Sequence, residues 1–223
     1  MSSTPKTLNV TEQHQLLDEL LNKDAPHKSF RKGVRNYCMA CLMLEAGLRV
    51  GEVTQLLITD LVFNLKPVTS IVVREEIAKN HKERIIPIST RLSQAISQMT
   101  ESYWPRASAS VSLRAFYRNS PDKPLTTRQV ERIIRNAGLK AIGRPVHPHI
   151  LRHTFATKLM RVTDMRTVQE LLGHSNMAST EIYTHPNADD KKSAIEEIDR
   201  YMSQTKEQNL KELGPHPLTD HLP

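Results

Sequence analysis

The repeat of apolar residues along this chain changes twice, and these changes limit the folds that are open to it. Up to residue 57, leucines and other apolar side chains recur three and four positions apart, the repeat of helices that bury one face. Between residues 60 and 88, β-branched residues gather in short runs separated by polar turns, a pattern typical of strands. The helical repeat returns from residue 91. The pattern predicts a mainly α-helical domain with one small antiparallel three-stranded β-sheet inserted near its first third, an α+β fold.

Capping residues and helix breakers indicate where these elements begin and end. Thr126 or Thr127 can cap a helix that Gly138 ends, and Asp164 can cap a short helix that stops at Gly173. Thr11 is a candidate cap for the first helix. The expected helices cover residues 11–21, 29–45, 50–57, 91–102, 126–140, 148–162, 164–173 and 188–205, and the expected strands cover residues 60–65, 68–77 and 83–88.

Size and composition exclude several classes of protein. The chain has 223 residues, of which 38% are apolar and 25% are charged, as in a soluble globular domain. No segment approaches the about 20 consecutive apolar residues of a membrane-spanning helix, and residues 1–10 hold no apolar run that could serve as a signal peptide. Cys38 and Cys41 have no second cysteine pair or close histidine pair to complete a zinc site. We therefore expect a cytoplasmic protein with buried thiols, no metal and no membrane partner.

Basic residues are concentrated in one part of the chain. Residues 101–166 hold 13 lysines and arginines against 4 acidic residues, a net charge of +9, whereas the rest of the chain sums to −2. So basic a segment is most simply explained by a polyanionic partner such as nucleic acid. Charge alone leaves open a basic face that only keeps the protein in solution.

Four short segments hold the residues that could do chemistry. His149 and Arg152 lie three positions apart, so on a helix they would share a face near its first turn, where an anion is favoured. Taken singly, each segment also has an ordinary structural explanation, such as a helix-cap arginine, a polar turn or a half-buried tyrosine. The segments cover residues 47–52, 78–84, 147–153 and 171–185.

Taken together and in this order, the segments resemble the catalytic domain of the tyrosine recombinase family, the Xer-type recombinases and phage integrases. In the hairpin, the family usually has glycine on both sides of its lysine, whereas this chain has Ala78 and Asn80 around Lys79. The matching stretches are EAGLRVGEV at 45–53, KNHKER at 79–84, PHILRHTFAT at 148–157, LLGHS at 171–175 and EIYTH at 181–185.

The resemblance implies a site-specific DNA recombinase or integrase. Its partner would be double-stranded DNA, and its place in the cytoplasm would be the nucleoid. Such an enzyme cleaves and rejoins DNA strands through a covalent 3′-phosphotyrosyl intermediate, without a metal or any other cofactor. Tyr183 would be the nucleophile, and the pair formed by Arg49 and Arg152 would clamp the phosphate with charge-assisted hydrogen bonds. The catalytic residues that the resemblance implies are Arg49, Lys79, His149, Arg152, His174 and Tyr183.

The chemistry of phosphoryl transfer explains why these residue types differ. A tyrosine has a pKa of about 10, so it needs a base, and His149 is the candidate. His174 would add a third donor to the phosphate oxygens, and a hairpin lysine would protonate the leaving 5′-oxygen. Lys79 and Lys82 are both candidates for that acid, and the alignment of the following Lys-Glu-Arg favours Lys79.

Other charged residues are expected around this site. Glu52 is interpreted as a support that orients Arg49 rather than as an acid catalyst. The residues expected to contact DNA are Lys82, Arg84, Arg128, Arg132 and Arg144.

The resemblance also implies an organisation of the chain. We expect a catalytic domain over residues 1–206, a flexible tail over 207–223, no N-terminal core-binding domain, and self-association into a tetramer on DNA. Two alternatives remain open: a type IB topoisomerase-like enzyme that nicks and reseals DNA, and a non-catalytic DNA-binding module. The presence of all six catalytic candidates argues against the binding module, which has no need of them.

Overall fold

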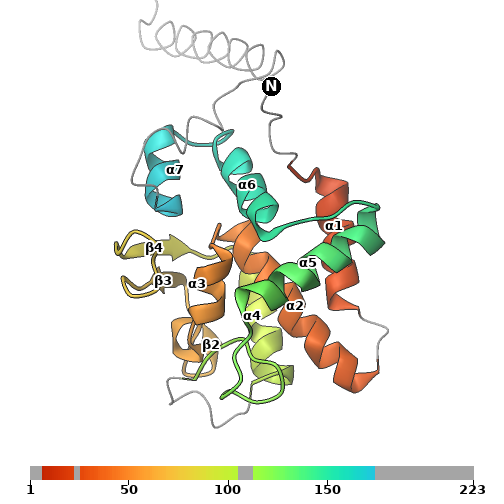
Figure 1. Ribbon diagram of the computed structural model, residues 1–223. Coiled ribbons are helices and arrows are strands. Elements are labelled where there is room, and N and C mark those ends of the chain that lie inside the picture. The colour runs from red at the N-terminus through yellow and green to blue at the C-terminus, as the bar shows by residue number, and fades with distance from the viewer. Residues whose placement is uncertain (1–6, 23–25, 105–112, 174–223) are drawn as a thin grey trace, which may run out of the picture. The chain divides into compact units, whose positions relative to one another are not determined.

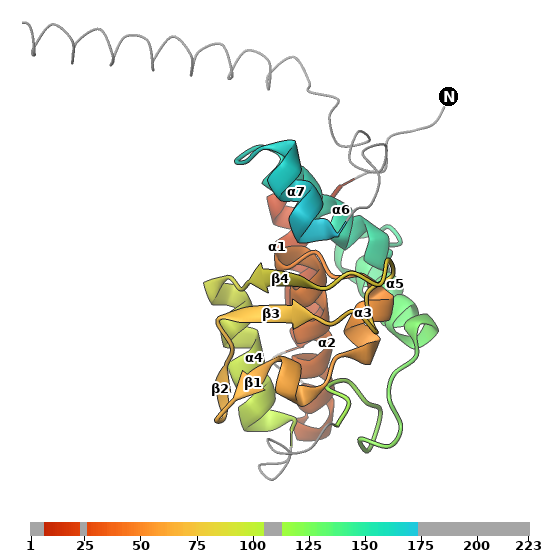
Figure 2. The same cartoon turned by 90° about the vertical axis from the view of Figure 1, so that its left-hand side faces the viewer.

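The computed structural model describes residues 7–22, 26–104 and 113–173. The helix expected over residues 188–205 and the expected tail lie outside these residues. Within them, a long helix, α2 (His27–Glu45), runs through the centre and contacts α1, α3, α4 and α6 (Figures 1 and 2). The surrounding helices are α1 (Val10–Leu21), α3 (Val50–Gln55), α4 (Thr90–Ser102), α5 (Thr127–Ile142), α6 (Pro148–Leu159) and α7 (Met165–Leu172).

The core forms around the middle of α2, which is buried on every side. Cys38, Cys41 and the residues between and just after them have no solvent exposure, so this segment contacts its neighbours around its whole circumference. Both cysteines are free and buried, as the sequence predicts. Burial raises the pKa of Cys41 to about 12, so this thiol stays protonated and acts as a small apolar side chain. None of the described helices is long and apolar enough to cross a membrane.

The sheet differs from the expected three-stranded arrangement. The described strands form two separate two-stranded sheets: β1 (Val62–Phe63) pairs with β2 (Lys66–Pro67), and β3 (Ser70–Val73) pairs with β4 (Arg84–Pro87), both antiparallel. The first expected strand turns back on itself at Asn64 and Leu65, both of which have positive φ, the backbone of a tight hairpin turn. It therefore pairs with the residues that follow it rather than with β3.

Helix limits follow local capping chemistry, and several of them differ from the expected positions. Asn9 rather than Thr11 caps α1, because its side chain accepts from the N–H of Glu12 while the Glu12 carboxylate accepts from the N–H of Asn9. Helix α5 begins after its Thr126 cap but continues past Gly138 to Gly143, which has φ +71°. Gly138 is instead a site of close packing, since a Cβ there would lie 2.5 Å from Val146 Cγ2. Helix α6 ends at Leu159, short of the expected residue 162.

Two contacts place α6, α7 and β4 beside one another. Helix α7 packs on α6 through a small cluster of Ala156, Val168 and Leu172, and α7 also contacts β4. In Figure 2, α7 lies above β4 at one end of the described residues. Helix α7 has the limits that the sequence predicts, with Asp164 as its cap and Gly173 at its end. The C-terminal turn of α7 therefore lies next to β4 and α6.

Candidate active site

Arg49 is held at the start of α3 by a turn that requires glycine. Gly47 has φ +61°, and a Cβ at that position would lie 2.4 Å from Phe155 Cδ1. The tight turn ends α2 and starts α3 within a few residues, with Arg49 as the residue that caps α3. Its side chain is 23% exposed, so the guanidinium lies at the surface with its stem covered.

Glu52 lies beneath Arg49 and receives hydrogen bonds from two arginines. Its carboxylate accepts from the Arg49 backbone N–H at 2.8 Å and from Arg49 Nη1 at 3.1 Å. The Arg84 guanidinium makes a paired contact on the other side, at 3.0 and 2.6 Å. Burial acts to raise the pKa of Glu52, but the hydrogen bonds and charge of Arg84, with help from Arg49 and Arg152, lower it overall. Glu52 is therefore an ionised anchor that orients Arg49.

Arg84 lies in a different environment from the one expected of a DNA contact. Its side chain is 6% exposed, and besides the two bonds to Glu52, its Nε donates to the Leu171 carbonyl at 3.1 Å. The guanidinium also packs against Gly173, whose added Cβ would lie 3.1 Å from Arg84 Cδ. In the described residues, Arg84 thus links β4, α3 and α7 from inside the domain.

Arg152 approaches the same region from α6. It is 4% exposed, its Nη1 donates to the Gly47 carbonyl, and its Nη2 donates to the Leu172 carbonyl at 2.7 Å. Arg49 Nη1 lies 3.5 Å from that Leu172 oxygen, and Arg49 Nη2 lies 3.4 Å from the Gly173 oxygen. Two guanidinium groups more than one hundred residues apart in the chain therefore converge on the end of α7.

His149 shares the first turn of α6 with Arg152, as its spacing predicts. Its side chain is exposed, but partial burial of the ring and the positive charges of Arg152 and Arg49 lower its pKa below the usual 6.5. The imidazole is therefore neutral at pH 7 and has a nitrogen available to accept a proton.

The remaining catalytic candidates are Lys79, His174 and Tyr183. His174 and Tyr183 are outside the described residues, although His174 directly follows Gly173, the residue that ends α7. Lys79 lies in the loop that joins β3 to β4, and both Lys79 and Lys82 are exposed. A hydrogen bond from Asn80 Nδ2 to the Gly173 carbonyl, at 2.9 Å, connects this loop to the same helix end.

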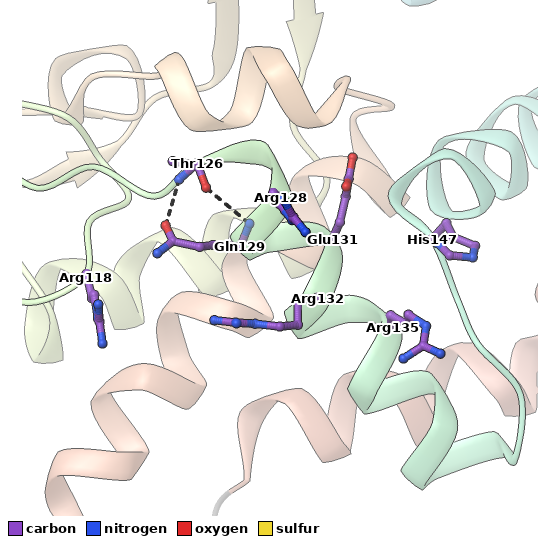
Figure 3. A pocket seen from close by; sticks show the side chains of 8 residues that line it. All are labelled: Arg118, Thr126, Arg128, Gln129, Glu131, Arg132, Arg135 and His147. Atoms are coloured by element: carbon purple, nitrogen blue, oxygen red, sulfur yellow. Dashed lines mark hydrogen bonds between the residues drawn. The ribbon is translucent and has the colours of Figure 1, made fainter.

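A basic groove runs along α5, and Figure 3 shows Arg128, Arg132 and Arg135 on that helix and Arg118 on a neighbouring loop. Arg128, Arg132 and Arg135 line it together with Arg118 and His147. The groove has a volume of about 690 Å³. Glu131 is the acidic residue of its lining, so the surface carries a net positive charge. Of the three expected DNA contacts in this part of the chain, Arg128 and Arg132 lie here.

Arg144, the third of them, lies elsewhere and is paired. Its guanidinium donates to Glu12 Oε1 at 3.0 and 2.9 Å, and its side chain is 26% exposed. It therefore ties the loop after α5 to the start of α1. In the described residues, no group of three His, Cys, Asp or Glu side chains is placed to hold a metal ion.

Sequence reasoning missed three features of this site. The basic sequence of the hairpin gave no sign that Arg84 is buried. Asn80 was noted only because the family usually has glycine at that position. The basic groove left a readable signal, because Arg128, Arg132 and Arg135 are four and three positions apart and so share one face of a helix.

The fold is that of a tyrosine recombinase catalytic domain, and comparison with known proteins agrees. A model of the phage integrase family matches residues 6–190. The tyrosine recombinase XerD of Staphylococcus epidermidis is 32% identical over 183 residues, which cover 81% of this chain and 58% of that protein. The tyrosine recombinase XerC of Azotobacter vinelandii is 34% identical over 184 residues, covering 81% and 56%.

Solved structures give the same result. The crystal structure of XerA recombinase has a TM-score of 0.67 at 29% identity, covering 88% of this chain and 66% of its own. The XerH site-specific recombinase bound to a palindromic difH substrate, in a post-cleavage complex, has a TM-score of 0.61 at 27% identity, covering 86% and 53%. The chain belongs to the phage integrase family of tyrosine recombinases. It spans a little over half the length of these curated relatives.

Proposed function

We propose that the protein is a site-specific DNA recombinase that cleaves and rejoins strands through a 3′-phosphotyrosyl intermediate. The main support is the convergence of Arg49 and Arg152 on the last carbonyls of α7, directly before His174. Two permanently charged guanidinium groups side by side form a site for a phosphodiester. The nucleophile Tyr183 follows nine residues after His174 in the sequence, which is the order the family uses.

A scissile phosphate would take over bonds that the arginines now make to the backbone. The Arg49 contacts to carbonyl oxygens are long, at 3.4 and 3.5 Å, and a phosphate oxygen is a stronger acceptor than a neutral carbonyl. Glu52 keeps Arg49 oriented during this exchange, because its two bonds to Arg49 do not involve the α7 carbonyls. Catalysis by charge stabilisation requires such donors to be fixed before the reaction.

Two proton transfers complete the step. His149, neutral at pH 7, accepts the phenolic proton of Tyr183 as the tyrosine oxygen forms a bond to phosphorus. The bond between phosphorus and the 5′-oxygen breaks, and Lys79 gives a proton to that oxygen. The phosphotyrosyl ester conserves the energy of the broken phosphodiester, so a 5′-hydroxyl can attack it and reseal the strand without ATP.

The basic groove on α5 supports double-stranded DNA as the partner. Arg128, Arg132 and Arg135 lie along one face of α5, where they can contact successive phosphates. Exposed Lys82 adds positive charge beside the Lys79 loop. We also propose assembly into a tetramer on DNA, since exchange between two duplexes requires four strands to be cut.

A covalent-adduct assay tests the proposal. Nicked suicide duplexes with a random central sequence are incubated with the protein, and DNA that becomes attached to it is sequenced to map the site. We expect a 3′-linked adduct with wild-type protein and none with Tyr183→Phe. DNA binding without any adduct would favour the binding module. Relaxation of plasmids that lack the mapped site would favour the topoisomerase alternative.

A further inference from the structure

The loop that carries Lys79 has buried residues just before the lysine and exposed residues just after it. Residues 74–83 connect β3 to β4. Before Lys79, the side chains of Ile77 and Ala78 are 7% and 5% exposed, and their N–H groups donate to the Arg74 carbonyl at 3.2 and 3.0 Å. From Lys79 to Glu83 every residue is exposed. After the lysine, the His81 N–H donates to the Ala78 carbonyl at 3.0 Å, which closes a turn within the loop, and the next buried residue is Arg84 in β4.

Asn80 supplies the side-chain hydrogen bond that ties the exposed part of the loop to α7. Its Nδ2 donates to the Gly173 carbonyl at 2.9 Å, across 93 residues of sequence. Among the described residues, no other side chain from Lys79 to Glu83 makes a hydrogen bond or ion pair. Glycine, which the family usually has at this position, offers no such donor. The bond is therefore a property of this chain's own sequence.

The acceptor of this bond is part of the phosphate site. Gly173 ends α7 with φ 61° and ψ 49°, which directs its carbonyl away from the helix. The same oxygen lies 3.4 Å from Arg49 Nη2. The carbonyl of the preceding residue, Leu172, accepts a hydrogen bond from Arg152 Nη2. The Asn80 contact thus connects the lysine loop to the end of α7, on which the two arginines converge.

We propose that Asn80 is a positioning residue that sets Lys79 relative to the arginine pair, an inference that rests on the proposed function. Consecutive Cα atoms lie about 3.8 Å apart, so fixing Asn80 limits where the Lys79 side chain begins. The bond places the Lys79 ammonium to protonate the 5′-oxygen as its bond to phosphorus breaks. Asn80 itself does not contact the reacting atoms.

Limited proteolysis tests the contact without DNA. Trypsin cleavage after Lys82 is measured in the folded protein and divided by the rate for the same bond in the urea-unfolded chain. An exposed hydrogen bond changes such an opening equilibrium by about three- to tenfold. We expect Asn80→Ala and Asn80→Asp to raise the ratio by about that factor, because neither keeps the amide donor. Glu75→Ala, an exposed change in the same loop, should leave the ratio unaltered.

A leaving-group substitution tests the positioning role. Two suicide duplexes carry the mapped site, one with the normal 5′-bridging oxygen and one with sulfur in its place. A thiol has a pKa of about 8.5, whereas a hydroxyl such as that of water has a pKa of about 15.7. The 5′-sulfur therefore leaves as a thiolate and needs no proton from Lys79. Asn80→Ala should slow adduct formation about three- to tenfold on the oxygen duplex and not on the sulfur duplex. Lys79→Ala should show a larger loss with the same rescue.

Each outcome decides the inference. Rescue by sulfur combined with faster proteolysis would support it. An equal loss on both duplexes, or no change in either assay, would overturn the positioning role while leaving the proposed function intact. Failure of the wild-type protein to form an adduct with either duplex would overturn the proposed function and this role together, even where proteolysis detects the Asn80 contact.

Discussion

At the scale of single residues, Glu52 explains how one acidic side chain supports a basic site. It is buried between Arg49 and Arg84, and both guanidinium groups donate to it. An ionised carboxylate in this position is stable because each arginine neutralises it. Arg49 reaches the surface, whereas Arg84 is buried. Removing Arg84 should therefore affect the stability of the fold more than removing Arg49.

Removal of Arg84 should destabilise the fold. In Arg84→Ala, the buried carboxylate of Glu52 loses its paired contact, and breaking a buried ion pair costs about 3–5 kcal/mol. The free energy of unfolding, measured by urea denaturation, should fall by about that amount. Arg166→Ala provides the control, because Arg166 is 88% exposed in its pair with Glu170, and such pairs contribute about 0.5 kcal/mol or less. Equal effects of the two changes would contradict the structural role assigned to Arg84.

His149 should set the acidic limb of the cleavage rate. Burial and the charges of Arg152 and Arg49 lower its pKa below 6.5, and only the neutral ring accepts the tyrosine proton. The rate of single-turnover adduct formation should therefore be nearly independent of this group at neutral pH, and it should fall with acidification in a limb centred below pH 6.5. His149→Gln should lower the rate by about 100-fold or more and remove this limb. A limb centred above pH 6.5 that persists in His149→Gln would assign the base to another group.

At the scale of elements, prediction succeeded where the determining contacts are local. The limits of α7 follow from Asp164 and Gly173, which act within one turn of the helix. The prediction of a three-stranded sheet was wrong because strand pairing depends on partners that are distant in sequence. The turn at Asn64 and Leu65 lets β1 pair with β2, which follows it directly. Gly138 was taken for a helix end because its packing against Val146 depends on tertiary structure.

The contact between α1 and α2 depends on a glycine in the same way. A Cβ at Gly33 would lie 2.0 Å from the Leu21 carbonyl oxygen, which is backbone and cannot move aside, whereas at Gly51 nothing lies within 4 Å. Gly33→Ala should therefore lower the free energy of unfolding by about 1–3 kcal/mol. Gly51→Ala, in α3, should raise it by about 0.5–1 kcal/mol. Thermal or urea unfolding of both variants measures the difference, and a stabilising Gly33→Ala would contradict this packing.

At the scale of the whole molecule, the site joins residues that no local pattern connects. Arg49 and Arg152 meet at the end of α7 because α6 packs on both α2 and α7. Sequence reasoning reached this pairing through the family resemblance, since spacing alone left Arg49 a helix-cap residue. The burial of Arg84 could not be predicted in this way, because the sequence of a hairpin does not show whether a basic residue in it is exposed or buried.

The basic groove should determine how DNA affinity depends on salt. Each phosphate contact releases counterions, so removing one arginine that contacts a phosphate should lower the slope of log affinity against log salt by about one. We expect Arg132→Ala to do so, and to weaken binding similarly for duplexes with and without the mapped site, because phosphate contacts do not read sequence. Lys66→Ala, an exposed change on β2, is the matched control and should leave the slope unchanged. A loss in Arg132→Ala confined to the mapped site would show that Arg132 contacts bases rather than phosphates.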